Sequence, residues 1–285
     1  KPEEVEWLLD GLKVDLVFNI AEGYAGRNRE AQVPMLLELK KIPYTGSDAL
    51  TLALTLDKVI TKRVLLGERI PTPDFFQLIR PDDPLPKNLT FPLIVKPRFE
   101  GSSKGISEHS VVHSVAELKK QASRIIQTYR QPVLVEQFIQ GTEFTVALIG
   151  NDPPEVFPVV QIAIDGHSDL GNLFYTFSRI ASGADYLCPA RIDATLERTL
   201  RDLALRTYQA VDCLDFGRVD FRVDAQGRPY VLEINPLPSL STEDVFMVVA
   251  KRMGVSYESL IGKIIDAAVK RQGLAPKRIP QVIRS

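Results

Sequence analysis

The fold of this chain is decided by the stretch Gly217-Arg218-Val219-Asp220-Phe221-Arg222-Val223, followed shortly by Tyr230-Val231-Leu232-Glu233-Ile234-Asn235. Between them, Asp224-Ala225-Gln226-Gly227 has the residue types of a tight turn. Two runs that alternate polar and apolar residues on either side of such a turn predict a β-hairpin. An antiparallel pair of strands is therefore expected over residues 217–235.

A two-residue loop at residues 225–226 would place Arg218 opposite Glu233 and Asp220 opposite Val231. Side chains alternate between the two faces of a strand. The polar face would then hold Arg218, Asp220, Arg222, Glu233 and Asn235, and the apolar face Val219, Phe221, Val223, Tyr230, Leu232 and Ile234. A shift of one residue would bury the charges, so the wholly apolar face supports this register.

The polar face of the hairpin has the chemistry of a magnesium site. Asp220 and Glu233 supply carboxylates beside the amide of Asn235, and Mg²⁺ prefers oxygen ligands while keeping room for substrate phosphates. Arg218 could hold an anion next to them, because a guanidinium matches phosphate and carboxylate geometry. The alternative is a solvated face with surface salt bridges, and the hairpin alone does not decide between the two.

Composition places the chain among soluble globular proteins. Its 285 residues are 45% hydrophobic and 25% charged, which suits two domains or three small lobes. A net charge of −1 argues against nucleic-acid or membrane-surface partners, and no apolar run reaches the length of a membrane span. Cys188 and Cys213 make no disulfide framework and residues 1–4 are not a signal peptide, which predicts reduced thiols in the cytoplasm.

Strands and helices alternate without long blocks of either, which predicts the α/β or α+β class. Strands are expected over 15–19, 75–78, 92–97, 132–139, 143–149 and 155–164, besides the hairpin. Helices are expected over 31–40, 48–56, 58–66, 115–128, 194–211, 243–253 and 256–272. The βαβ rhythm at the start has no earlier strand, so the first domain is expected to be partial.

Two further segments have phosphate-binding and nucleotide-binding chemistry. Glu100-Gly101-Ser102-Ser103-Lys104-Gly105 offers hydroxyls and backbone N–H groups that can wrap phosphate oxygens, and Lys96 precedes it at a strand end. Its spacing is not that of a Walker loop, and alone it would be an ordinary flexible turn. Glu136-Gln137-Phe138-Ile139 leaves a buried strand as a connector that could contact a flat base, and the carboxylate of Glu143 could accept ribose hydroxyls.

The order of these motifs along the chain resembles the ATP-grasp superfamily and, within it, the D-alanine–D-alanine ligase group. The motifs are Asp57-Lys58, Val95-Lys96-Pro97, the Ser102-Ser103 loop, Val135-Glu136-Gln137-Phe138-Ile139, Gly141-Thr142-Glu143, Gly217-Arg218-Val219-Asp220 and Leu232-Glu233-Ile234-Asn235. The resemblance covers about residues 14–272 and implies a nucleotide held between two α+β lobes. It implies part of an α/β pre-ATP-grasp domain at 1–57, a central lobe at 58–145 and a C-terminal lobe at 146–285.

The resemblance also implies a role for each motif residue. Lys58, Lys96 and Ser103 would contact ATP phosphates, Glu136, Phe138 and Ile139 the adenine, and Glu143 the ribose. Asp220, Glu233 and Asn235 would hold two Mg²⁺ ions, for which Mn²⁺ could substitute. The catalytic positions would be Arg218, Ser102 and Ser239, with Arg218 stabilising charge on the reacting intermediate.

Such enzymes transfer the γ-phosphoryl group of ATP to a carboxylate, and an amine then attacks the acyl phosphate to give an amide, ADP and phosphate. The implied partners are small amino-acid or carboxylate substrates, with a homodimer expected by analogy. Two readings from other classes stay open at this point: a nucleotide-binding regulatory module that has lost catalysis, and phosphoryl transfer without an amine.

The chain departs from D-alanine ligases on the substrate side. The loop over residues 19–30 lacks their histidine and contains Arg27 and Arg29, which could bind an acidic group or be solvated. Ser239 replaces a glycine whose N–H faces the oxyanion, and Glu243-Asp244 replaces a small hydroxyl near the substrate carboxylate. An acidic residue there would repel a carboxylate. We therefore expect an amide-forming ligase. Substrates other than D-alanine are slightly favoured over true D-alanine ligase activity.

Overall fold

The computed structural model describes residues 9–164, 166–168, 170–171 and 185–274. The helices are α2 (Gln32–Leu39), α3 (Ala49–Leu56), α4 (Lys58–Gly67), α5 (Val115–Tyr129), α7 (Ala194–Ala210), α8 (Val245–Met253) and α9 (Tyr257–Arg271). The strands are β1 (Phe75–Leu78), β2 (Leu93–Pro97), β3 (Val111–Val112), β4 (Val133–Gln137), β5 (Gly141–Ile149), β6 (Glu155–Val156), β7 (Val160–Ala163), β8 (Asp185–Leu187), β9 (Phe216–Asp224) and β10 (Pro229–Asn235).

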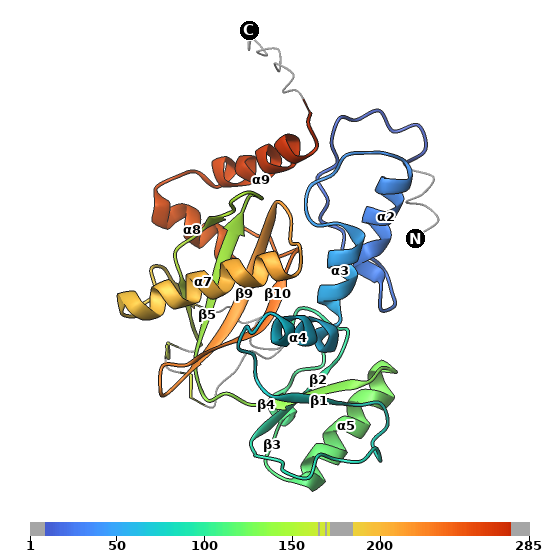
Figure 1. Cartoon of the computed structure of the whole chain (residues 1–285), viewed down its shortest axis with the longest axis vertical. Coiled ribbons are helices and arrows are strands. Elements are labelled where there is room, and N and C mark those ends of the chain that lie inside the picture. The colour runs from blue at the N-terminus through green and yellow to red at the C-terminus, as the bar shows by residue number, and fades with distance from the viewer. Residues whose placement is uncertain (1–8, 165, 169, 172–184, 275–285) are drawn as a thin grey trace.

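The named strands form two antiparallel sheets, and α4 lies between them (Figure 1). The smaller sheet has the order β1-β4-β2-β3. Helix α5 covers one of its faces, packing Leu118, Ala122 and Ile125 against Val95 and Val135. Ser114 starts this helix by accepting a hydrogen bond from the backbone N–H of Glu117, which satisfies a donor that the first turn leaves without a partner.

The larger sheet has the order β10-β9-β5-β7-β8, with β6 paired to β5. Helix α7 covers one face, where alternate residues of β5 such as Phe144 and Val146 are buried. On the opposite face, α8 and α9 cover the end that carries Ala147 and Ile149. The other end of that face has polar side chains instead, among them Thr145, and this is the end next to the smaller sheet. The fold thus leaves a polar surface between the two sheets.

The structure corrects the expected hairpin register. Glu233 pairs with Asp220 and Asn235 with Arg218, two positions from the expected register. The loop has three residues, 225–227, instead of two, since the N–H of Asp224 donates to the carbonyl of Arg228, and this shifts the pairing by one. A β-bulge between Val231 and Glu233 shifts it by one more. The bulge adds Leu232 without a partner, and such an extra residue reverses the alternation that follows it. Leu232 therefore leaves the apolar face and lines a cavity, while Val231 is fully buried in the core. The polar residues of both strands still share one face.

Two other expected strands differ from the structure. The expected strand over residues 15–19 is a single isolated parallel bridge between Val17 and Tyr44. Within the described residues, this segment pairs with no named strand that could extend the bridge into a ladder. The expected strand over 155–164 is divided into β6 and β7, and Pro158 between them has no N–H to donate to a ladder. Among the described residues, no helix combines the length and the hydropathy that a membrane span requires.

Candidate active site

A cavity of about 500 Å³ opens between the two sheets. The residues expected to bind the nucleotide or the metal, or to act in catalysis, all lie in its wall: Lys58, Lys96, Ser102, Ser103, Glu136, Phe138, Ile139, Glu143, Arg218, Asp220, Glu233, Asn235 and Ser239. They come from α4, from both sheets and from the loops between strands, so segments far apart in the sequence meet around a single space.

Asp220 is held in place by the hairpin and by β5. Arg218 donates two hydrogen bonds to its carboxylate, from Nε to Oδ1 at 2.9 Å and from Nη2 to Oδ2 at 2.9 Å. Asn235 donates from Nδ2 to Oδ2 at 2.9 Å, and the Thr145 hydroxyl donates to Oδ1 at 2.6 Å. The other nitrogen of the guanidinium lies 4.0 Å from the carboxylate of Asp244, which caps the start of α8. Arg218 therefore sits between two carboxylates.

Glu233 pairs with Lys58 across the boundary between α4 and β10, with Nζ 2.6 Å from Oε2. Asp57 starts α4 by accepting the N–H of Ile60, which places Lys58 in the first turn facing the cavity. Burial alone would raise the pKa of Glu233, but Lys58 in particular, helped by Lys96 and Arg218, lowers it to about 2. The carboxylate is therefore charged at neutral pH.

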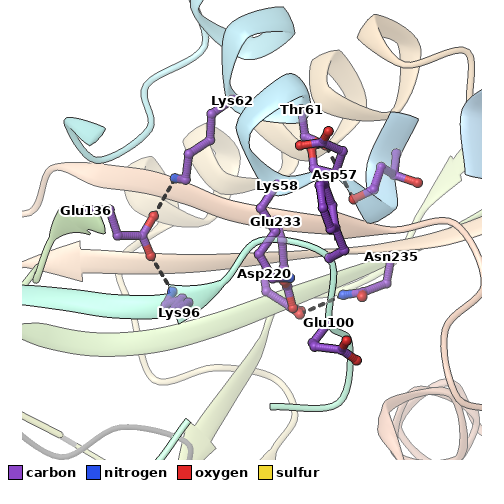
Figure 2. A network of polar contacts seen from close by, with 12 residues as sticks. Asp57, Lys58, Thr61, Lys62, Lys96, Glu100, Glu136, Asp220, Glu233 and Asn235 are labelled. Carbon is purple, nitrogen blue, oxygen red and sulfur yellow. Dashed lines mark hydrogen bonds and ion pairs between the residues drawn. The ribbon is translucent and has the colours of Figure 1, made fainter. Parts of the chain in front are cut away.

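Glu136 is shared by two lysines, one on each side (Figure 2). Lys62 approaches Oε2 at 2.7 Å and Lys96 donates to Oε1, and the side chains of Lys62 and Glu136 are only 2% and 1% exposed. Burial alone would raise the pKa of Glu136, but the two ammonium groups lower it to about 2. Such a buried carboxylate stays charged only because both partners are present.

The connector after β4 is fixed by Arg222 of β9. Its Nη1 donates to the carbonyl of Ile139 at 2.7 Å, and its Nε lies 3.1 Å from a carboxylate oxygen of Glu143. The guanidinium also stacks 4.7 Å from the centre of the Phe138 ring. Burial raises the pKa of Glu143, with Arg222 opposing the shift. The strand that carries Asp220 thus also positions the connector.

The glycine-serine loop is bent sharply over the cavity. Ser102 and Ser103 have φ angles of 51° and 53°, a left-handed conformation that is uncommon for residues with a side chain. At Gly105, φ is 80° and a Cβ atom would lie 2.4 Å from Pro97, so only glycine fits there. Ser239 lies across the cavity, where its hydroxyl accepts the N–H of Ser241 at 3.2 Å.

The two arginines of the N-terminal loop do not face the cavity, so neither is placed to bind an acidic substrate group. Arg27 pairs with Asp57 at 2.7 Å and lies over the ring of Phe99. Arg29 donates to the carbonyl of Phe99 at 2.6 Å and lies 3.8 Å from Glu30. Both tie the loop over residues 19–30 to Phe99, which directly precedes the glycine-serine loop.

Several wall residues had not been assigned a role from the sequence. Leu232 reaches the wall only because of the bulge, which nothing in the alternation of the hairpin indicates. Lys62 was not assigned a role either, and it lies behind the wall rather than in it. Its spacing of four residues from Lys58, however, places both lysines on one side of a helix. Glu22 and Glu30 also line the cavity, and burial raises the pKa of Glu30 to about 7 against the opposing charge of Arg29.

The oxygen groups of the hairpin suit a hard divalent ion. Asp220 and Glu233 face each other in the ladder, with Asn235 next along the strand. Within the described ranges, no three His, Cys, Asp or Glu side chains come together as a metal cage. Two carboxylates and an amide would leave coordination positions for phosphate oxygens, which is how Mg²⁺ is usually bound beside a nucleotide. The residues present therefore fit magnesium together with a phosphate-bearing substrate.

Known proteins resemble this chain over most of its length. The family described as D-ala D-ala ligase C-terminus matches residues 67–266. The protein named "Uncharacterized protein y4sG" of Sinorhizobium fredii is 40% identical over 256 residues, covering 90% of this chain and 75% of that protein. The D-alanine–D-alanine ligase of Pelotomaculum thermopropionicum is 33% identical over 273 residues, covering 92% of this chain and 82% of that protein.

Among solved structures, the D-alanine–D-alanine ligase of Bacillus anthracis in complex with ATP matches with a TM-score of 0.78 and 24% identity. The match covers 96% of this chain and 84% of that one, and it confirms the predicted fold class. The structural match shows the fold, whereas the family match and the curated ligases show the family. The chain belongs to the D-alanine–D-alanine ligase family and is an ATP-dependent ligase with the ATP-grasp fold.

Proposed function

We propose that this ligase activates a small carboxylate substrate with ATP and joins it to an amine, forming an amide through an acyl phosphate. The observation that carries the proposal is the convergence of Asp220 and Glu233 with Lys58, Lys96 and Arg218 on a single cavity. Phosphoryl transfer depends mainly on positioning and on stabilising charge, and this arrangement provides both.

The cations of the cavity would bind the phosphates. Lys58 reaches it from helix α4 and Lys96 from strand β2 of the smaller sheet, and the backbone N–H groups around Ser102 and Ser103 would close over the phosphate oxygens. Bound at Asp220, Glu233 and Asn235, two Mg²⁺ ions would neutralise the transferring phosphoryl group, and Mn²⁺ could replace them. Lys58 and Arg218 pair with the negative charges of Glu233 and Asp220.

The connector would receive the nucleoside. Phe138 and Ile139 offer an apolar surface for adenine beside the polar group of Glu136, and Glu143 would accept ribose hydroxyls. On the reacting side, Arg218 and the backbone N–H of Ser239 would face the developing oxyanion. Ser102 would contact the substrate from the loop above.

The acidic lining of the substrate side favours amine or carboxylate substrates other than D-alanine. Glu22, Glu30 and Asp244 all lie in the wall there, and Asp244 is 4.0 Å from Arg218, where it competes for any substrate carboxylate. We further propose that the enzyme works in the cytoplasm as a homodimer, which light scattering on the purified protein would test. A catalytically degenerate regulatory module is not favoured.

The test is an amino-acid panel with ATP and MgCl₂, in which ADP release and the mass of the product are both measured. We expect ADP release only with a productive pair, together with a product that has lost one water relative to the two substrates. Normal nucleotide binding without substrate-stimulated ADP release would instead indicate a regulatory module. A phosphorylated product without an amide would indicate phosphoryl transfer alone.

A further inference from the structure

Helix α4 sends one ammonium group to each sheet. Lys58 pairs with Glu233 of β10, and Lys62, one turn later, pairs with Glu136 of β4 (Figure 2). Lys58 lines the cavity, whereas Lys62 does not. Lys62 is 1% exposed, so it has no route to a bound nucleotide. Its charge nevertheless costs desolvation energy, which calls for a structural reason.

Lys62 also joins the smaller sheet to the hairpin. Its Nζ donates to the hydroxyl of Thr72 at 2.6 Å, and that hydroxyl donates to the carbonyl of Val231 at 2.8 Å. The backbone N–H of Val231 returns a hydrogen bond to the carbonyl of Pro71 at 2.8 Å. A continuous polar chain therefore runs from Glu136 through Lys62 and Thr72 to β10, two residues before Glu233.

The two oxygens of Glu136 have different partners. Oε2 faces Lys62 inside the protein, and Oε1 receives Lys96, whose side chain lines the cavity. With Lys62 in place, one carboxylate oxygen is left for Lys96. Without it, the buried oxygen would lack a cation, and the carboxylate would turn to engage Lys96 with both oxygens. That would draw the Lys96 ammonium away from the phosphates.

We propose that Lys62 is a positioning residue for nucleotide binding, which holds Glu136 so that Lys96 is presented to the phosphates at a fixed distance from the metal-binding hairpin. The proposal rests on the proposed function, since it takes the cavity to bind ATP. It assigns Lys62 an effect on ATP affinity without any contact to ATP. The hydrogen bonds through Thr72 also fix the distance between the smaller sheet and the hairpin, and this distance is part of the effect on ATP affinity.

The first experiment measures binding of a non-hydrolysable ATP analogue with MgCl₂ to the full chain by calorimetry. We expect Lys62→Met to raise the dissociation constant about tenfold or more, because Lys96 turns toward Glu136. In steady-state kinetics the KM for ATP should rise by more than kcat falls. The control is Arg63→Met, an exposed cation on the same helix, which should bind like the wild type.

A double-mutant cycle separates positioning from lost charge balance. If Lys62 acts through Glu136, then Lys62→Met/Glu136→Gln should bind no more weakly than Glu136→Gln alone. Additive losses, or wild-type binding by Lys62→Met, would overturn the proposal.

If Lys62→Met does not fold, Thr72→Val replaces it, because it keeps the ion pair while breaking the chain of hydrogen bonds to β10. It should raise the dissociation constant about threefold, and an unchanged value would count against the proposal. Absence of binding by the wild type would reject the proposed function itself.

Discussion

At the scale of single residues, the site is built from buried charges that each have a partner. Glu136 has two lysines and Arg222 has Glu143, while Glu233, which is only half-buried, has Lys58. Breaking one such pair usually costs about 3–5 kcal/mol because the remaining charge is stranded away from water. Substitutions that keep the shape of a side chain but remove its charge are therefore the informative ones here.

Asp220→Asn and Glu233→Gln should each lower turnover about a hundredfold or more, because each removes a negative charge from the predicted metal ligands. Both substitutions keep the size of the side chain, so circular dichroism should show an intact fold. The readout is ADP release at saturating ATP with a productive substrate pair.

Asp202→Asn serves as the matched control, since this aspartate lies exposed on α7 and makes only a 3.9 Å pair with Arg206. It should leave turnover unchanged. Wild-type rates in either hairpin variant would show that these carboxylates do not bind the catalytic metal.

The pairing of Glu136 predicts how stability depends on pH. Its pKa is about 2 in the folded chain, against an ordinary value of 4.5. The lysines around Glu136 therefore contribute about 3 kcal/mol to the free energy of unfolding at neutral pH. This contribution is fully present above the pKa of the unfolded chain and is lost as pH falls through the pKa of the folded chain. In Lys62→Met/Glu136→Gln the free energy of unfolding should fall less steeply between about pH 5 and about pH 2.

Urea titrations at several pH values would measure that slope. Glu155→Gln is the control, because its exposed pair with Lys263 should leave the slope as in the wild type. Equal slopes for the wild type and the double variant would show that Glu136 is not held by its lysines.

At the scale of elements, the hairpin shows how far the sequence alone could lead. Its strands, the position of its turn and its shared polar face follow from the sequence, but the length of the loop does not, since three residues and not two connect the strands. The helices at 58–67 and 115–129 follow from their caps and periodicity. The bulge at Leu232 does not, because an extra residue costs little locally and is fixed by what packs on each side. The partner of Lys62 could not be predicted either, because Glu136 comes from a distant strand of the smaller sheet, although the spacing of Lys62 from Lys58 places both lysines on one side of α4.

The bulge can be tested by comparing its two neighbours. Strict alternation would bury Leu232, whereas the structure buries Val231 and places Leu232 in the cavity wall. Val231→Ala should therefore lower the free energy of unfolding by about 2–3 kcal/mol. Leu232→Ala should cost less than about 1.5 kcal/mol and instead raise the KM for ATP.

Chemical denaturation and initial-rate kinetics on the two variants would distinguish the registers. If Leu232→Ala proved the more destabilising and left the KM for ATP unchanged, the hairpin would have the regular register without a bulge.

At the scale of the whole molecule, a second buried charge joins the N-terminal segment to the larger sheet. Asp215 is fully buried before β9 and accepts the N–H of Gly46 at 2.8 Å and the amide of Asn151 at 2.9 Å. Arg271, in the last turn of α9, binds both of its oxygens at 3.0 and 2.7 Å and also donates to the carbonyl of Tyr44. Segments from both ends of the described chain thus meet at one carboxylate.

Arg271→Met should therefore lower the free energy of unfolding by about 3–5 kcal/mol, because it leaves Asp215 charged and buried with neutral donors only. Backbone N–H exchange at Gly46 should accelerate along with the loss of global stability, since the amide loses a fixed acceptor. Lys263→Met removes the same charge from an exposed pair on the same helix and should cost less than about 1 kcal/mol. If the two variants were equally stable, Asp215 would be balanced by groups other than Arg271, and the N-terminal segment would be held to the sheet by apolar packing instead.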